Sequence, residues 1–413
     1  MAPAVPQVDQ ASGVLLLVGA GAMAEGYLSA AQRRGWSVAV VESVGRLEEL
    51  RSRFSCVVDG EPIESTSTVD ESWILPTVML AERTRPSSVL AFAESHVLAA
   101  TFVQEKLGLR GPGMCAAAAS RNKAAQRSLF ATAGLGQPEW KLVSELGDAA
   151  NWAHERLPVV VKPLSRMGSS GVERVDDVTA WEETVQRRAG DGPLLVEEYI
   201  PGDEYSLEAF VSSGEILFCN LTKKMTSGAP NFVELAHIVG YANEDPELSA
   251  LAKETLAGVV NAVGVKTSIV HLEFRLRENG TLAVMEVAVR TPGDHILELA
   301  SMAYDFDLYE VAIDLAFGNR PSRELLAVER ARIAGVQYVV SSSQGTLRDI
   351  DCSEWAQLPG VERSYIMAEI GEEVRPATES AERLGYVLFA QSDLTTLRLS
   401  MDKAVEASKF LVI

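Results

Sequence analysis

The chain has 413 residues, 47% of them hydrophobic and 23% charged, which is ordinary for a globular protein with room for two or three domains. Its 57 acidic and 37 basic residues give a net charge of −20, which argues against nucleic acid or an anionic membrane as the main partner. The four cysteines lie far apart, and no apolar run approaches the roughly 18 residues of a membrane span. We therefore expect a cytoplasmic protein with reduced thiols.

The N-terminal part of the chain is expected to be an α/β domain. Residues 1–12 lack the basic and apolar regions of a secretion signal, and we expect them to be a disordered leader. Residues 13–43 then follow the order strand, glycine turn, helix and strand, and residues 86–109 repeat the order strand and helix. These patterns predict a parallel-sheet domain over residues 13–110.

The glycine turn of this domain, "GAGAMAEG", is similar to a dinucleotide-binding motif. Its glycines are Gly19, Gly21 and Gly26, so the third glycine falls two positions late for the GxGxxG spacing. The spacing favours a structural turn. A nicotinamide oxidoreductase is the alternative, which fluorescence transfer to NADH would test.

Two lysines follow a glycine-proline break in the chain. Lys123 lies early in a predicted helix, where it contacts either an anion or solvent. Lys162 ends a β-branched strand and precedes a loop that contains Gly168, Ser169 and Ser170. Glycines let backbone N–H groups approach phosphate oxygens and serine hydroxyls add donors, so the loop is either a phosphate cradle or a polar turn.

An acid-rich segment comes next. Glu197 closes an apolar strand, Tyr199 and Ile200 precede a Pro-Gly turn, and Glu204 opens the next strand. The carboxylates can accept hydrogen bonds from an exocyclic amine and from ribose hydroxyls, and the backbone between them can pair with an adenine edge. A surface hairpin is the alternative interpretation.

Two carboxylates occur in a predicted β-hairpin further along the chain. Its turn, Asn279-Gly280, predicts a two-residue loop that pairs Glu273 with Glu286. Their Cβ atoms would lie roughly 4.5–5.5 Å apart, where like charges are unfavourable without a positive group between them. Arg290 has the parity of Glu286 and is expected on the same face. Either a divalent cation lies between the carboxylates, or the face is solvated.

The remaining elements frame this hairpin. The sequence predicts a long helix over about 245–263 before it and two helices near 295–318 after it. From about residue 332, three strand-like runs precede a final helix over 395–411.

The order of these features is a lysine, a lysine with a glycine loop, an acidic hinge, paired carboxylates and an arginine. It resembles the ATP-grasp superfamily over about residues 112–330. The resemblance implies an α/β and α+β fold in which two subdomains enclose ATP between antiparallel sheets. We therefore expect a small ATP-grasp subdomain at 111–195, a large one at 196–330, and a C-terminal lobe at 331–413 packed on the large subdomain.

The resemblance also implies how ATP is held. The implied nucleotide-binding residues are Lys123 and Lys162 at the phosphates, Gly168, Ser169 and Ser170 in a lid loop at 166–172, Glu197, Tyr199 and Ile200 at the adenine, and Glu204 at the ribose.

The chemistry at the phosphates is implied in the same way. Glu273 and Glu286 match the ligands of Mg²⁺, which Mn²⁺ is able to replace. Arg290 matches the catalytic arginine that stabilises an acyl phosphate.

One position departs from the superfamily pattern E-x-N-x-R. The sequence reads "EVAVR", which puts Ala288 in place of a metal-binding asparagine and is similar to the L-amino acid (dipeptide) ligase branch. Glu234 and His237 then match its amino-acid pocket, with His237 also catalytic, although a histidine in this apolar run is by itself more typical of a buried one. Gly293 and Asp294 are assigned to the substrate because "RTPGDHI" resembles the R-x-G-G-D-H turn of these ligases.

The implied activity is ATP-dependent, ADP-forming ligation through an acyl phosphate. Two small-molecule substrates are expected. The carboxylate substrate is expected to be an amino acid, and the amine substrate a second amino acid or a peptide. The resemblance implies no nucleic-acid or membrane partner and is compatible with a homodimer. The alternatives are an ATP-grasp carboxylase that uses bicarbonate, and a non-catalytic ATP-binding protein, which would be expected to lose the carboxylates or the arginine.

Overall fold

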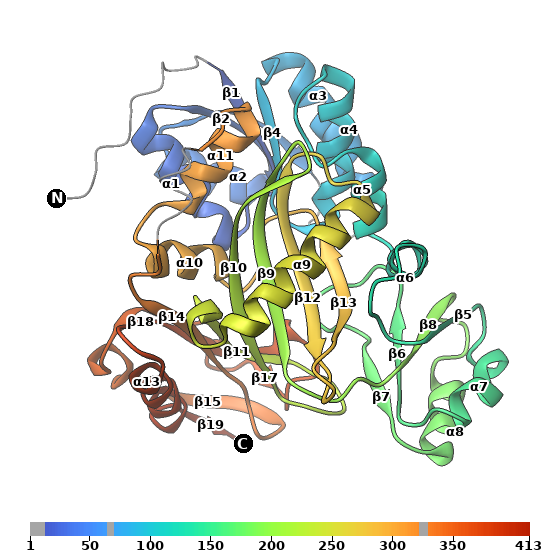
Figure 1. The fold of residues 1–413 in the computed structure, drawn as a ribbon. Helices are drawn as coiled ribbons and strands as arrows, with labels where there is room; N and C mark the ends of the chain where they lie inside the picture. The colour runs from blue at the N-terminus through green and yellow to red at the C-terminus, as the bar shows by residue number, and fades with distance from the viewer. Residues whose placement is uncertain (1–12, 64–69, 322–328) are drawn as a thin grey trace.

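The computed structural model of the protein describes residues 13–63, 70–321 and 329–413, so the predicted leader at 1–12 lies outside the described residues. Figure 1 shows an N-terminal α/β unit above a long sheet, with a smaller sheet and a C-terminal lobe at its lower sides. Within these ranges, no helix has both the length and the apolar character needed to cross a membrane.

The N-terminal unit is a parallel sheet with helices, as predicted. Its strand order is β3-β2-β1-β4, and every pair is parallel. Strands β1 and β2 are almost entirely buried, which suits their aliphatic sequences. The elements are β1 (Val14–Val18), α1 (Glu25–Arg34), β2 (Ser37–Ser43), α2 (Val44–Arg53), β3 (Val57–Ile63), α3 (Ile74–Thr84), β4 (Ser88–Ala91) and α4 (Val97–Leu107).

The glycine turn of this unit serves close packing. Gly19 has a φ of +77°, and a Cβ on it would lie 1.8 Å from Cε1 of His96. The His96 ring packs against Trp73, and its Nδ1 accepts a hydrogen bond from the N–H of Ala93. This packing supports the structural interpretation of "GAGAMAEG" over the nicotinamide alternative.

A small antiparallel sheet forms the next unit, with the strand order β5-β8-β6-β7. Helices α7 and α8 bury their apolar side chains against it. Lys162 lies in β6, after three valines that favour an extended chain. The elements are α5 (Met114–Ser120), α6 (Lys123–Thr132), β5 (Trp140–Val143), α7 (Ala150–His154), β6 (Val159–Pro163), β7 (Glu173–Val175), α8 (Val178–Arg187) and β8 (Leu194–Glu198).

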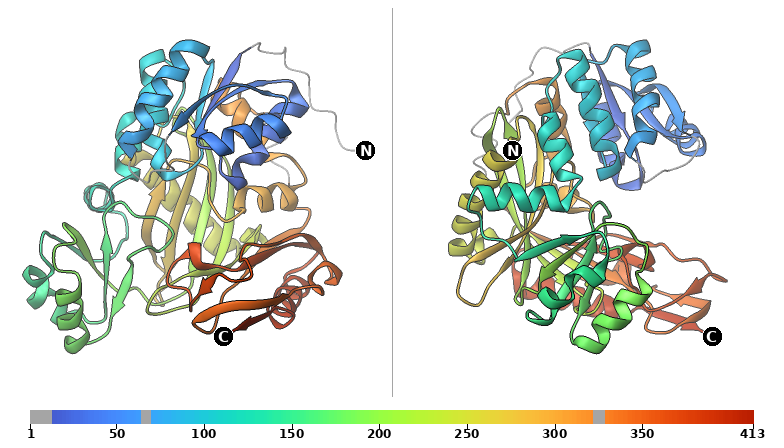
Figure 2. Two further views of the ribbon diagram at one scale, coloured as in Figure 1. Left: turned by 180° about the vertical axis from the view of Figure 1, so that it is seen from behind. Right: turned by 90° about the vertical axis from the view of Figure 1, so that its right-hand side faces the viewer.

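The largest sheet has eight antiparallel strands in the order β13-β12-β9-β10-β11-β14-β18-β16. Apolar side chains of alternate residues in its first strands pack against α9, which leaves the polar alternates on the other face. Seen from behind (Figure 2, left), the N-terminal unit, the small sheet and the C-terminal lobe surround that other face. The elements are β9 (Glu204–Ser212), β10 (Glu215–Thr226), β11 (Glu234–Val239), α9 (Pro246–Val263), β12 (Ser268–Leu276), β13 (Leu282–Ala288), α10 (Ile296–Tyr304) and α11 (Leu308–Phe317).

The C-terminal lobe is joined to the large sheet by strand pairing. β14 bonds to β11 and continues the sheet through β18 and β16. The predicted final helix over 395–411 is wrong at its end, because α13 stops at Glu406 and β19 pairs with β15. The elements are β14 (Ile333–Val339), β15 (Gly345–Asp351), β16 (Val361–Ile366), β17 (Glu373–Val374), β18 (Gly385–Gln391), α13 (Leu394–Glu406) and β19 (Lys409–Val412).

The hairpin of β12 and β13 has a longer turn than predicted, but Glu273 and Glu286 still pair. The turn has three residues, because the N–H of Arg277 donates to the carbonyl of Thr281 and Gly280 takes a positive φ. Pairs near the turn are therefore shifted by one residue. A bulge at Met285 compensates for the shift, and Glu273 lies opposite Glu286 as predicted.

Gly280→Ala is expected to destabilise the protein through its backbone alone. Nothing lies within 4 Å of the added Cβ, but the φ of +79° costs an L-residue about 1 kcal/mol. Gly147→Ala is the matched control, since its Cβ also meets open space and its φ is outside the left-handed region. Thermal unfolding should show a lower midpoint for Gly280→Ala only. Equal midpoints would contradict the left-handed turn.

Candidate active site

A cavity of about 390 Å³ lies on the polar face of the large sheet. The N-terminal unit, the small sheet, the large sheet and the C-terminal lobe all contribute to its wall. Every predicted site residue lines the cavity except Ser170 and Glu197. Those that do are Lys123, Lys162, Gly168, Ser169, Tyr199, Ile200, Glu204, Glu234, His237, Glu273, Glu286, Arg290, Gly293 and Asp294.

Strand register arranges polar side chains in rows on one face of the large sheet. Because side chains alternate along a strand, every second residue of β9, β10 and β12 lies on the face that carries the cavity. Residues opposite each other on neighbouring strands then form rows across the sheet. The rows are Asn220, Glu208 and His271, then Thr222, Ser206, Glu273 and Glu286, and then His237, Lys224, Glu204 and Arg275.

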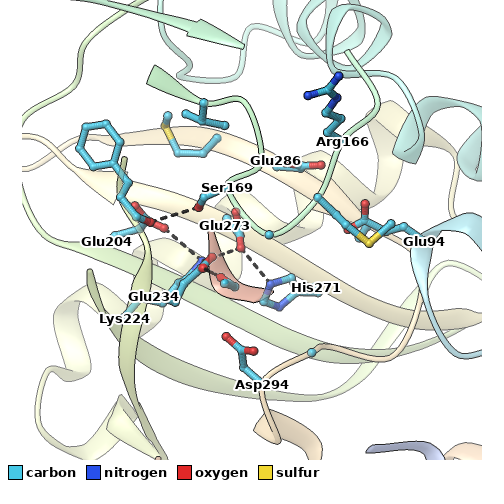
Figure 3. Close-up of a pocket in the computed structure, with 18 of the residues that line it drawn as sticks. Glu94, Arg166, Ser169, Glu204, Lys224, Glu234, His271, Glu273, Glu286 and Asp294 are labelled. Atoms are coloured by element: carbon cyan, nitrogen blue, oxygen red, sulfur yellow. Dashed lines mark hydrogen bonds and ion pairs between the residues drawn. The ribbon is translucent and has the colours of Figure 1, made fainter. Parts of the chain in front are cut away.

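The two predicted metal carboxylates each hold a lysine. Glu273 Oε1 lies 2.6 Å from Nζ of Lys224 and 3.2 Å from Nε2 of His271. Figure 3 shows these three side chains grouped together in the pocket. Glu286 Oε1 lies 2.9 Å from Nζ of Lys123. Burial raises the pKa of Glu286, whereas Lys224 and His271 outweigh burial and hold the pKa of Glu273 well below its usual range.

These carboxylates fit a magnesium ion that arrives with a nucleotide. Mg²⁺ in phosphate-transfer sites is typically held by one or two carboxylates together with substrate phosphates. Among residues 13–63, 70–321 and 329–413, no group of three or more His, Cys, Asp or Glu side chains could hold a metal by itself. Ala288 lines the cavity, as predicted, and supplies no ligand. A metal at these carboxylates would therefore need further oxygens from the nucleotide.

A flat slot follows β8 at one end of the cavity. The ring of Tyr199 stacks with that of Phe232 at 6.1 Å between centroids, and the Arg275 guanidinium lies within 6 Å of both rings. Arg275 also donates to the carbonyl of Ile200 at 2.9 Å and to Glu204 at 2.8 Å. Aromatic rings and a guanidinium beside this backbone suit contact with a planar base, whereas Glu204 is paired with Arg275 and Lys224.

Glu197 lies beneath the cavity and not on its wall. Its carboxylate is fully buried, 2.5 Å from Nε of Arg127 and 2.6 Å from Nζ of Lys162. Burial favours a high pKa for Glu197, but the two cations lower it. Burial and the Arg127 charge also lower the pKa of Lys162. Glu197 therefore holds Lys162 in place and cannot contact a base directly.

The predicted lid loop is tied to two other segments. Gly168 and Ser169 both have positive φ, and Ser169 Oγ donates to the carbonyl of Phe232 at 3.1 Å. The Gly168 carbonyl accepts a bond from the N–H of Ser380 in the C-terminal lobe at 3.3 Å. Ser170 does not line the cavity, because it sits in a turn in which its N–H donates to Met167.

At one end of the cavity, the predicted substrate residues bind partners from the C-terminal lobe that the sequence did not indicate. Asp294 lies 2.8 Å from Nε2 of His237 and 2.7 Å from Nη2 of Arg383, which comes from the C-terminal lobe. Although burial acts to raise it, the pKa of Asp294 is well below its usual range because of Arg383 and His237. Glu234 accepts a bond from Ser380 of the same lobe.

Arg290 forms a salt bridge with Glu94 of the N-terminal unit. Its Nη2 lies 2.5 Å from Glu94 Oε1, and Arg121 binds the other Glu94 oxygen at 2.9 Å. Sequence reasoning missed Glu94, Arg383 and Lys224. Only Lys224 had a local signal, since the alternating polar residues of "NLTKK" place it on one face of a strand.

Arg383→Gln should leave the buried Asp294 carboxylate without its main cation and destabilise the protein by on the order of 3 kcal/mol. Adding Asp294→Asn should recover part of that loss, because the two side chains form one pair. Arg363→Gln is the control, since Arg363 binds Glu298 at 2.7 Å but is exposed. Urea unfolding measures the three effects. Additive losses in the double variant would contradict the pairing.

Comparison with known families agrees with this geometry. Residues 155–298 match a family model described as ATP-grasp domain, and residues 337–412 match one described as L-amino acid ligase C-terminal domain 2. An L-arginine-specific L-amino acid ligase of Bacillus subtilis is 22% identical over 323 residues, which cover 75% of this chain and 77% of that protein. An alanine–anticapsin ligase of Bacillus subtilis (strain 168) is 23% identical, with 62% and 59% covered.

Solved structures share the fold. The crystal structure of an L-amino acid ligase from Bacillus licheniformis has a TM-score of 0.83 at 21% identity and covers 97% of this chain and 99% of its own. Phosphoribosylglycinamide synthetase from Anaerococcus prevotii has a TM-score of 0.73 at 15% identity, with 97% and 100% covered. The chain therefore contains an ATP-grasp domain and an L-amino acid ligase C-terminal domain, and its relatives include L-amino acid ligases.

Proposed function

We propose that the protein is an ATP-dependent, ADP-forming ligase that joins the carboxylate of an amino acid to the amine of a second amino acid or a peptide. One observation carries the proposal. A single cavity brings together two lysines, a pair of facing carboxylates and an arginine, which are the groups that acyl-phosphate chemistry requires.

The first step would transfer the γ-phosphoryl group of ATP to the substrate carboxylate, giving an acyl phosphate and ADP. Lys123, Lys162 and the backbone of the lid loop would hold the phosphates, and the slot at Tyr199 would hold the base. Glu273 and Glu286 would hold Mg²⁺, or Mn²⁺ in its place, which when bound neutralises charge on the phosphates. The protein contributes position and charge in this step.

The ion pairs in the cavity suggest that Lys123 and Lys224 would change partners when ATP and a metal bind. Lys123 and Lys224 neutralise Glu286 and Glu273 while no metal is bound. If Glu286 and Glu273 held a metal, the ammonium groups of Lys123 and Lys224 would be free to contact the phosphates. Each carboxylate would then have a positive partner in both states, which limits the cost of burying it.

The second step would be attack of the amine on the acyl phosphate, which forms the amide and releases phosphate. Arg290 would stabilise the acyl phosphate and then the tetrahedral oxyanion. Its salt bridge to Glu94 holds the guanidinium toward the cavity from the side of the N-terminal unit. The lid loop would exclude water, since an exposed acyl phosphate hydrolyses.

The substrate class rests on relatives and on the polar end of the cavity. Relatives are named as an L-arginine-specific L-amino acid ligase and as alanine–anticapsin ligases. Glu234, His237 and Asp294 offer hydrogen-bonding groups for an amino acid. We further propose that the reaction takes place in the cytoplasm, where ATP is supplied, and that the protein can form a homodimer.

A phosphate-release screen of amino-acid pairs with ATP and Mg²⁺ tests the proposal. Release that requires two amino acids, together with a new peptide in mass spectrometry, is the expected result. Release that requires bicarbonate would replace the proposal with the carboxylase alternative. ATP binding without turnover under any pair would favour the non-catalytic alternative.

Glu286→Gln is expected to reduce turnover by at least about 10²-fold, because it removes one oriented charge from the phosphate site. The amide keeps the size of the side chain, so the fold should stay intact, but the thermal midpoint should fall because Lys123 loses its ion pair. Glu183→Gln, an exposed change on α8, is the control. Near wild-type turnover of Glu286→Gln would contradict the proposal that Glu286 binds Mg²⁺.

A further inference from the structure

Strand β13 is the edge of the large sheet, so one side of its backbone lacks a neighbouring strand. Side chains of α6 cover this edge instead. Gln126 accepts a bond from the N–H of Val287 at 2.8 Å and donates to its carbonyl at 3.1 Å. The N–H of Val284 donates to the carbonyl of Gly136 at 2.8 Å. The strand that carries Glu286 is thereby fixed from outside the sheet.

Arg127 completes this edge at the bulge. Its Nη1 and Nη2 donate to the carbonyls of Val284 and Met285 at 3.2 and 2.7 Å. Met285 is the residue without a cross-strand partner, directly before Glu286. A bulge takes carbonyls out of the ladder, and a buried carbonyl without a donor is unfavourable. The guanidinium therefore stabilises the bulge that puts Glu286 opposite Glu273.

The third nitrogen of the Arg127 guanidinium, Nε, faces Glu197 and, through it, Lys162. Nε lies 2.5 Å from Glu197 Oε1, and Glu197 Oε2 lies 2.6 Å from Nζ of Lys162. The side chains of Arg127 and Glu197 are both 0% exposed, so solvent cannot compete for these bonds. One planar guanidinium thus connects the strand of a metal carboxylate to a phosphate lysine.

We propose that Arg127 is a positioning residue of the ligase reaction, which aims Glu286 through the bulge and Lys162 through Glu197. The inference rests on the proposed function. Arg127 is outside the cavity wall, so it acts through these neighbours and not on the substrate. A lysine cannot take its place, because an ammonium is a point charge and lacks the planar fork that serves two carbonyls and a carboxylate at once.

Arg127→Lys tests the proposal with Mn²⁺ as the probe in the presence of ADP, read by electron paramagnetic resonance of free Mn²⁺. We expect binding to weaken roughly 10- to 100-fold, as is typical when a group that orients a metal ligand is lost. Arg277→Lys is the matched control. Arg277 also joins the hairpin to β8, through Glu198, but touches neither the bulge nor Lys162. Its Mn²⁺ affinity should equal that of wild type.

Equal Mn²⁺ affinity in Arg127→Lys and wild type, or equal losses in both variants, would overturn the positioning role. Wild-type protein that binds no Mn²⁺ with ADP would overturn the proposed function itself, so the two failures are distinguishable.

Hydrogen exchange on the wild type keeps the proposal testable if Arg127→Lys does not fold. Amides of residues 284–288 should be as protected without ligands as with Mn²⁺ and ADP, because α6 already holds the bulge. A large gain in protection on adding the ligands would mean that the ligands order this strand, which contradicts the proposal.

Discussion

Two carboxylates face each other across neighbouring strands in a buried cavity, and each is stable there because a lysine ammonium lies against it. Glu273 binds Lys224 from the same sheet, and Glu286 binds Lys123 from α6. The second pair joins the small-sheet unit to the large sheet through Glu286, one of the two predicted metal carboxylates. If a metal replaced these ammonium groups at the carboxylates, both carboxylates would still have a positive partner and the ammonium groups could contact phosphates.

The cavity exists only at the junction of all the units, which explains how an acidic chain can receive an anionic nucleotide. The net charge of −20 is spread over the molecule, whereas basic side chains from the small-sheet unit, the large sheet and the C-terminal lobe converge on one cavity. The C-terminal lobe closes this junction in two ways. Its strands continue the large sheet, and its Arg383 and Ser380 reach Asp294 and Glu234. This end of the cavity is thus shared between the large sheet and the lobe.

The sequence predicted the parts of the fold that depend on local periodicity. Alternation along the strands placed Glu273 and Glu286 on one face, and the parallel N-terminal sheet followed from its aliphatic runs. The turn at Gly280 was predicted with two residues and has three. The pairing of the carboxylates survived because a bulge at Met285 offsets the turn, and the donors that stabilise this bulge come from α6, far away in sequence.

Long-range charge pairs explain the other differences. The acidic hinge placed Glu197 at the nucleotide, but Arg127 and Lys162 engage its carboxylate below the cavity. Arg383 has no local pattern that indicates a site. The final strand, β19, was included in the predicted helix, because its pairing with β15 is a long-range contact that the local pattern does not indicate. Each case turns on a partner distant in sequence, which single-chain periodicity does not reveal.

Oxygen-isotope transfer tests the central claim most directly. With a substrate amino acid labelled with ¹⁸O in its carboxylate, an acyl-phosphate route must deliver one carboxylate oxygen to the released phosphate. The account predicts one ¹⁸O in each phosphate formed, measured by mass spectrometry together with the amide product. Amide formation that releases only unlabelled phosphate would contradict it.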